Sequence, residues 1–394
     1  MSRNVQPKLR VMFSCVRPLT VPDGASRDVW VLSDTVQPIF KSLWRPTNEA
    51  AQIQRSPREL PSRAADNLFW LGRNVEHADW TLRVLRNCLS RIEEDSGPRQ
   101  DLGLARTALT TLLNHGGASP VGVPTGLDEP QVIAHLARTL MTATDRPYGL
   151  PQTLDHVHRI AGLTRDRLSL EAWRTLAGRR WLPKSTPTSI GEQLDLIDSS
   201  LAAISAFNGL THENMTRNFG WTFLDMGRRL SRAQNLAQIL LSAFRSGQKD
   251  EGDGGLLFVL ELADSFITYR SRYRLNPVIA LVLDLLIVDE TNPRSLAFQL
   301  AALSSHIDQL PQTSEGRGRT EAQRAALSML NAVRLADVEG LAQLDAGGAR
   351  PALTTLLVLQ IETLPRLLDA ITRRYFSMTE KEPHWVRARS GQGP

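Results

Sequence analysis

The longest regular pattern of hydrophobic positions starts after Ser62 and has the spacing of an amphipathic helix. Apolar residues recur every three or four positions to about residue 94, which places them on one face of a helix that Ser62 can cap. The pattern predicts one long helix whose apolar face is buried against other elements. The seven positions of this face are Leu68, Leu71, Val75, Ala78, Leu82, Leu85 and Leu89.

The same pattern occurs again 155 residues later. Adding 155 to each of the seven positions again gives apolar residues, and the Gly-Arg dipeptide at 72 is matched by another at 227. Two copies, centred on 62–94 and 217–246, predict an internal two-fold repeat whose helices pack together or lie in equivalent halves of a bundle. A chance match is the alternative, which the common register over 22 positions disfavours. The second set is Phe223, Met226, Leu230, Ala233, Ala237, Leu240 and Phe244.

Two more helix starts are predicted beyond the second copy. In Asn276-Pro277 and Asn292-Pro293 the asparagine can accept hydrogen bonds from free backbone amides, and the proline suits the first helical position. The first of these helices would contain the apolar segment 278–288, which is typical of a helix buried in a bundle. Short loops between long helices favour antiparallel neighbours.

The first fifty residues differ from the rest of the chain. Two β-prone runs, 11–16 and 29–32, are separated by prolines and a glycine, a pattern typical of strands and turns. The polar tail, 377–394, is predicted to be disordered. We therefore predict an all-α protein: a long-helix antiparallel bundle with an internal two-fold repeat, plus a short β-like N-terminal extension, residues 1–50.

The composition is that of a globular protein and is weak evidence for a polyanionic partner. The chain has 394 residues, 42% of them hydrophobic, and a formal net charge of +5. Of its 46 basic residues only five are lysines, an arginine bias that genome composition explains as readily as nucleic-acid or membrane binding does. Nucleic-acid binding is therefore kept only as an alternative.

Cysteine usage and terminal sequence favour the cytoplasm. Cys15 and Cys88 are the only cysteines, too few for a disulfide framework or a structural zinc site. The N-terminus lacks the features of a signal peptide, and no apolar run reaches the roughly 20 residues that span a bilayer. We therefore expect no membrane span. Common catalytic and phosphate-binding motifs are also absent, so we expect no metal and no cofactor.

Arginines beside the apolar face of the repeat helices form the first candidate site. Arg73 lies four residues before His77, and Arg228 lies four residues before Arg232, so each pair shares one helical face. Glu76 can reach Arg73 within its helix and is the candidate general acid or base. The glycine before each Arg indicates close approach of another element. A solvated flank with weak local ion pairs is the alternative.

A second group of candidates follows an apolar stripe in the segment 261–274. The stripe runs directly onto Arg270, which predicts a core-facing guanidinium that must be paired and is suited to binding carboxylate or phosphate. Together with the repeat arginines this group predicts an anion pocket, and a buried structural salt-bridge network is the alternative. The other members are Arg272 and Arg294, with Asp264 and Tyr269 as polar neighbours.

Four stretches carry a family resemblance. In chain order they read SRAADNLFWLGRNVEHAD, GWTFLDMGRRLSRAQN, FITYRSRYR and DETNPRSLAFQ. Together they resemble the alpha-E family, a bacterial all-helical domain named for a Glu-Arg motif. The resemblance covers about residues 60–376 and places a helical domain at 58–376. No activity is established for that family, so the resemblance does not imply one.

The resemblance also implies a biochemical context. Members of that family occur beside or fused to circularly permuted ATP-grasp proteins, in a peptide- or amide-ligating system that also involves transglutaminase-like proteins. Residues 23–34, DGASRDVWVLSD, resemble the last strand region of such an ATP-grasp domain. Residues 1–50 are accordingly interpreted as a remnant of the C-terminal edge of an ATP-grasp domain, and a separate ATP-grasp protein is the implied partner.

The family's Glu-Arg dipeptide would fall at Glu76-His77 and at Ser231-Arg232. The first copy keeps the acid and the second keeps the base, so each has lost one partner. Our hypothesis is that Glu76 and Arg232 complement one another across the repeat, with the two helices antiparallel and in register. The hypothesis requires the two side chains to lie within about 8 Å of each other.

Three functions compete on this evidence. The leading one is a non-catalytic helical partner of an ATP-grasp ligase, binding that enzyme or its anionic peptide-like substrate. The second is an enzyme with Glu76 as acid or base, favoured by a concave pocket joining Glu76, Arg73, Arg228 and Arg270 and disfavoured by a dry, fully paired network. The third is a nucleic-acid binding protein, which needs one continuous basic surface stripe.

Overall fold

The computed structural model describes residues 60–93, 102–114, 121–146, 148–177, 189–245, 253–311 and 318–376. Within these ranges the regular structure is helical and contains no strand, so the all-α prediction is confirmed. The predicted β-like extension, 1–50, and the predicted disordered tail, 377–394, lie outside the described residues.

The described part of the chain forms helices of very different lengths, the longest being the two that the repeat pattern predicted. In chain order the α-helices are α1 (Ser62–Glu93), α2 (Leu102–Leu113), α3 (Glu129–Thr142), α4 (Leu150–Leu163), α5 (Leu170–Ala177), α6 (Ile190–Asn214), α7 (Phe219–Phe244), α8 (Asp253–Leu262), α9 (Phe266–Tyr273), α10 (Ile279–Leu283), α11 (Leu296–Gln309), α12 (Glu321–Arg334), α13 (Val338–Ala342) and α14 (Pro351–Ile371). Short 3-10 or π turns are η3 (Arg165–Arg167), η5 (Asp284–Val288) and η6 (Thr372–Phe376).

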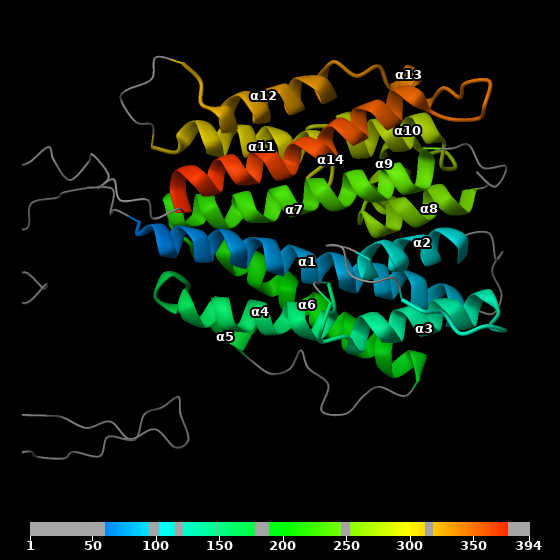
Figure 1. Cartoon of the computed structure of the whole chain (residues 1–394), viewed down its shortest axis with the longest axis horizontal. Helices are drawn as coiled ribbons and strands as arrows, with labels where there is room; N and C mark the ends of the chain where they lie inside the picture. The colour runs from blue at the N-terminus through cyan, green and yellow to red at the C-terminus, as the bar shows by residue number, and fades with distance from the viewer. Residues whose placement is uncertain are drawn as a thin grey trace, which may run out of the picture. The chain divides into compact units, whose positions relative to one another are not determined.

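Helices α1 and α7 lie side by side at the centre of the bundle (Figure 1). Helices α2, α3, α4 and α6 pack against α1, whereas α11 and α14 pack against α7 and α12 covers α11 and α14. All seven predicted apolar positions of each central helix are buried. The asparagine before α7, Asn218, begins that helix by accepting hydrogen bonds from the amides of Gly220 and Trp221.

The two central helices run parallel, so the antiparallel register predicted for them is wrong. Phe69 near the start of α1 and Phe223 near the start of α7 both have ring centroids 5.4 Å from that of Phe376. Five helices separate α1 from α7 in the chain, so the short-loop rule that favours antiparallel neighbours does not apply to this pair. Phe376 follows the last turn of α14, which therefore runs opposite to both (Figure 1).

A sharp break separates α8 from α9 and overturns the prediction that Arg270 faces the core. The amide of Ser265 donates to the carbonyl of Leu260 and that of Asp264 donates to Glu261, the hydrogen bonds of a Schellman motif with Asp264 left-handed at φ 53°. The break resets the helical phase. Tyr269 is therefore the fully buried residue of α9, and Arg270 is exposed.

Both predicted Asn-Pro helix starts are displaced. The first helix begins at Ile279, after Val278 rather than Asn276. The second, α11, begins at Leu296, where the side chain of Ser295 accepts from the amide of Phe298. Asn292 instead accepts from the amide of Arg294 and forms the turn that precedes the helix, because its amide group is held by Ser265 and Leu285.

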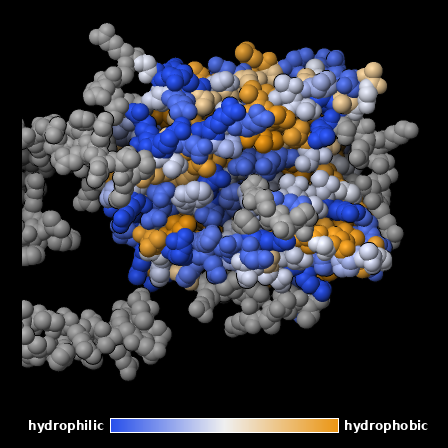
Figure 2. Space-filling model, in the orientation of Figure 1, coloured by the Kyte–Doolittle hydropathy of each residue, from blue (hydrophilic) through white to orange (hydrophobic). Residues whose placement is uncertain are grey.

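The surface of the described residues mixes hydrophilic and hydrophobic side chains (Figure 2). Exposed leucines occur on α14 and on either side of α13, at Leu335, Leu344 and Leu359. No helix among the described residues combines the length and apolarity needed to cross a bilayer. No cluster of three or more His, Cys, Asp or Glu within the described ranges is arranged to hold a metal ion.

Candidate functional site

The candidate site is built around the crossing of α1 and α7, where two glycines bring the backbones into contact. A Cβ added to Gly72 would lie 2.0 Å from the carbonyl oxygen of Leu224, and one added to Gly227 would lie 2.1 Å from that of Phe69. These contacts are reciprocal, since Leu224 and Gly227 follow Phe69 and Gly72 by the same 155 residues. Only glycine fits at either position, which explains why each long helix tolerates one.

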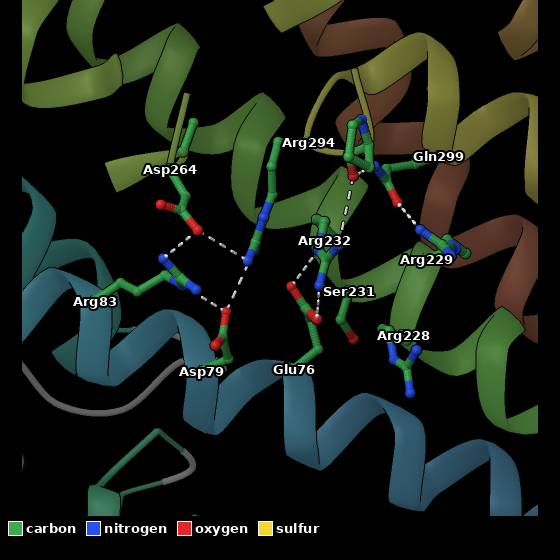
Figure 3. A network of polar contacts seen from close by, with 12 residues as sticks. Glu76, Asp79, Arg83, Arg228, Arg229, Ser231, Arg232, Asp264, Arg294 and Gln299 are labelled. Carbon is green, nitrogen blue, oxygen red and sulfur yellow. Dashed lines mark hydrogen bonds and ion pairs between the residues drawn. The ribbon is translucent and has the colours of Figure 1, made fainter. Parts of the chain in front are cut away.

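Glu76 and Arg232 form a two-pronged ion pair across this contact (Figure 3). The Nε and Nη2 atoms of Arg232 each donate to one carboxylate oxygen of Glu76 at 2.6 Å. The hypothesis that the two half-motifs complement each other is therefore confirmed, although the helices are parallel. Glu76 is only 1% exposed. Burial opposes the charge of Arg232, but the carboxylate of Glu76 outweighs it and raises the pKa of Arg232 above its usual value.

A second ion-pair group extends from Glu76 along α1 (Figure 3). The buried carboxylate of Asp79 accepts from Arg83 at 2.8 Å and from Arg294 at 3.5 Å. The same two arginines reach Asp264, at 3.2 Å and 3.6 Å. Burial of Asp79 opposes its charge, yet the nearby arginines hold its pKa below the usual value, whereas burial and neighbouring cations lower the pKa of Arg294 to about 10.

A third group surrounds Asp225, two turns before Arg232 on α7. Asp225 accepts from Arg229 at 3.0 Å and from His306 at 2.9 Å, and lies 3.4 Å from Arg228. Burial of Asp225 opposes its charge, but the hydrogen bond from His306 and the arginines outweigh it and hold its pKa well below the usual value. Burial lowers the pKa of Arg228 to about 10.

No carboxylate among the described residues pairs with Arg73, the equivalent of Arg228 on α1. Arg73 is 7% exposed, and its Nε and Nη1 have no hydrogen-bond partner. Its guanidinium lies 5.3 Å from the ring centroid of Trp70. Nearby, His77 Nε2 is 3.4 Å from Ser231 Oγ, and the ring centroids of His77 and Tyr148 are 4.6 Å apart. Burial lowers the pKa of Arg73 and raises that of Tyr148 to about 12, so Tyr148 keeps its proton at neutral pH.

Residues 60–376 match a family described as a predicted alpha-helical domain with a conserved ER motif, named Alpha-E. The chain belongs to the Alpha-E family. Its match covers every helix described above, from α1 to η6. In this Alpha-E domain Glu76 of α1 and Arg232 of α7 meet as a buried ion pair.

The Alpha-E chain is also similar to uncharacterised proteins of Mycobacterium bovis and Mycobacterium tuberculosis. Each is 26% identical over 397 aligned residues, which cover 93% of this chain and 43% of the relative. The chain therefore spans less than half the length of these relatives. No solved structure matches it.

Four of the six candidate arginines gather around α1 and α7, and two do not. Arg73, Arg228 and Arg232 lie at the helix contact, and Arg294 reaches it from the turn before α11. The predicted pocket joining Glu76, Arg73, Arg228 and Arg270 is not formed, because Arg270 is exposed on α9. Arg272, the other arginine outside the contact, is exposed on α9 and pairs with Asp289. Tyr269, a predicted polar neighbour, is buried on the same helix, where its hydroxyl accepts from the amide of Val278 and donates to the carbonyl of Asn276.

Several members of the Alpha-E site were not among the residues predicted from the sequence. Asp79 precedes Arg83 by four residues, and Asp225 precedes Arg229 by four, a spacing that joins acid and base on one helix face. That spacing was the signal available to find them. No comparable signal exists for His306 and Tyr148, because they reach the site from elements that are distant in the chain.

Proposed function

We propose that this Alpha-E protein is a non-catalytic helical partner of a circularly permuted ATP-grasp peptide or amide ligase, and that it binds the ligase or its anionic peptide-like substrate. The observation that carries the proposal is the state of Glu76. Both of its carboxylate oxygens accept hydrogen bonds from Arg232, and it is almost fully buried. An acid or base that is saturated in this way cannot exchange a proton with a substrate unless the pair opens.

The other carboxylates at the helix contact support the same view. Asp79 and Asp225 each accept hydrogen bonds from two arginines, so they stabilise the contact rather than present a reactive oxygen. This network is the outcome that disfavours the enzyme alternative. The nucleic-acid alternative has little support, since Arg73, Arg228 and Arg232 are buried or half-buried at a helix contact and cannot join one exposed basic stripe with Arg270.

The relatives show that sequence of this kind occurs within much longer chains. A match over 93% of the chain cannot be confined to residues 60–394, so it includes part of the segment before residue 60. Sequence like that segment therefore precedes an Alpha-E-like region in proteins more than twice as long as the match. The resemblance of residues 23–34 to the end of an ATP-grasp domain is the reason for choosing that class of partner.

A pull-down from the native host tests the proposal. The full chain, tagged and expressed at its natural level, is expected to co-purify with a protein that has an ATP-grasp core, and adding the purified chain to that protein is expected to increase its substrate-dependent ADP release. A matched control carries Arg334→Gln, which removes one partner of an exposed ion pair remote from α1 and should leave capture unchanged. Failure to enrich any ATP-grasp protein over a tagged unrelated helical protein would end the proposal.

A further inference from the structure

Arg73 and Arg228 occupy equivalent positions in α1 and α7 but have opposite electrostatic surroundings. Each directly follows the glycine at the helix crossing, and each is 7% exposed. Two carboxylates act on Arg228: Asp225 lies 3.4 Å away, and Glu76 also favours its charged form. Arg228 is therefore a buried cation beside carboxylates of the chain, which it shares with Arg229 and Arg232.

The two positions that supply these carboxylates carry neutral residues around Arg73. Subtracting the repeat offset of 155 from Asp225 gives Trp70, and adding it to Glu76 gives Ser231. Trp70 does contact Arg73, as its ring centroid is 5.3 Å from the guanidinium carbon. The α1 copy of this position therefore has the arginine but neutral residues in place of both acids.

Arg73 consequently remains a buried guanidinium that no described carboxylate neutralises. Its Nε and Nη1 atoms are buried and donate no hydrogen bond. A buried charge without a partner ordinarily costs several kcal/mol, and truncating one member of a buried pair is costly for the same reason. Tyr148 does not supply the missing charge, because burial keeps it protonated at neutral pH.

Polar groups on the Arg73 side of the helix contact are suited to hold one small anion, and one of them, Tyr148, acts electrostatically on Arg73. Tyr148 and Ser231 have hydroxyl groups, and His77 lies between them, 3.4 Å from Ser231 Oγ and in ring contact with Tyr148. Trp70 is 39% exposed, so the guanidinium lies within one side chain of the surface. One guanidinium among two hydroxyl groups and an imidazole matches a monoanion better than a phosphate dianion, and a guanidinium binds the two oxygens of a carboxylate with two parallel hydrogen bonds.

We propose that Arg73, assisted by His77, Tyr148 and Ser231, binds the carboxylate group of a ligand, which takes the place that Asp225 and Glu76 take beside Arg228. The inference rests on the anion-binding part of the proposed function and not on the identity of the partner. It narrows the six candidate arginines to one. The carboxylate belongs to a free small acid or to the end of a peptide, and the same chemistry recognises both.

Binding is measured on the isolated full chain at constant ionic strength, by calorimetry and by the shift in Tm. The probes are acetate, the tripeptide Gly-Gly-Ala, its C-terminal amide and inorganic phosphate. We expect saturable stabilisation by acetate or by the tripeptide acid, and at least a tenfold weaker effect of the amide and of phosphate. A tighter tripeptide acid identifies a peptide end, whereas equal affinities identify any small carboxylate. Equal binding of acid and amide, or tighter binding of phosphate, overturns the proposal.

Two variants locate the site. Arg73→Gln should weaken carboxylate binding at least tenfold, whereas the matched surface variant Arg272→Gln should change it less than twofold. Ser231→Glu places on α7 the acid that α1 has at the equivalent position, Glu76. The new carboxylate should pair with Arg73, raise Tm and abolish the binding of an added carboxylate. Unchanged carboxylate affinity in either Arg73→Gln or Ser231→Glu contradicts the proposal. Because no ligase is present in this measurement, its failure is distinct from a failed pull-down.

Discussion

The two sides of the α1–α7 contact have the same backbone geometry and different chemistry. On one side Glu76 and Arg232 form a buried ion pair with both hydrogen bonds at 2.6 Å. On the other side, called the neutral side because it has no arginine–carboxylate pair, the equivalent residues are Ser231 and His77, with Ser231 Oγ 3.4 Å from His77 Nε2. Gly72 and Gly227 correspond, as do the seven predicted apolar positions of each helix. The comparison teaches that close backbone approach fixes the contact, while the polar positions beside it are free to diverge.

The charged side has the larger consequence for stability. Desolvation makes a buried ion pair a weak source of net stability, but removing one partner leaves the other charge uncompensated. On the neutral side the two residues share only a weak hydrogen bond, so truncating one of these side chains should change the free energy of unfolding little.

Glu76→Gln should lower the free energy of unfolding by about 3–5 kcal/mol, because it leaves Arg232 buried without its counter-charge. Ser231→Ala on the neutral side should cost about 1 kcal/mol or less. Urea denaturation followed by circular dichroism gives both values. Glu290→Gln, which breaks the exposed pair with Arg334, is the control and should cost about 0–1 kcal/mol. Similar losses for Glu76→Gln and Ser231→Ala would contradict the comparison.

Gly72→Ala and Gly227→Ala should each cost about 1–3 kcal/mol or more, because the new methyl group meets a rigid backbone carbonyl at 2.0 Å and 2.1 Å. The two losses should agree within about 0.5 kcal/mol, since the contacts are reciprocal. Gly209→Ala in α6 is the matched control, as nothing lies within 4 Å of its added Cβ. It should stabilise the protein by about 0.5–1 kcal/mol through helix propensity. Losses that differ widely between Gly72 and Gly227 would show that only one glycine is needed for the approach.

Acid should destabilise the protein mainly through the carboxylates of the charged side. Asp225 has a pKa held below the usual 3.8 in the folded state, so its contribution is fully present above that value and is lost as the pH falls through the folded-state pKa. Asp225→Asn should lower stability at pH 6 and flatten its dependence on pH below about 4. Denaturation midpoints across this range give the slope. A variant that keeps the wild-type slope would assign acid sensitivity to other groups.

Asp264 is the outermost acid of the charged side and gives the smallest effect. Its left-handed backbone favours glycine, while its exposed carboxylate adds only a weak pair with Arg83 and Arg294. Asp264→Gly should therefore stay within about 0.5 kcal/mol of the wild type, and Asp264→Ala should lose about 1 kcal/mol. Thermal unfolding of the two variants distinguishes backbone strain from charge. An equal loss in both would mean that the carboxylate matters more than the turn.

Local sequence pattern predicted the helices well and the helix breaks poorly. The three-four spacing placed all fourteen apolar positions of α1 and α7 in the core, because that periodicity depends only on residues within a few turns. The same reasoning failed at Arg270, since it extended one helical phase through Ala263 and Asp264, where a left-handed residue ends α8. A non-glycine residue at that position gave no local sign of the turn.

The sequence by itself determined the two long helices, their buried faces and the two glycines at their crossing, because these follow from short-range periodicity and from the lack of a side chain. The sequence also led to the expected pairing of Glu76 with Arg232, but the parallel course of α1 and α7 and the lack of a carboxylate beside Arg73 among the described residues follow only from the packing of the helices. These facts depend on residues more than 150 positions apart. The spatial relation of such residues is set by the packing of all the helices between them, which no local pattern encodes.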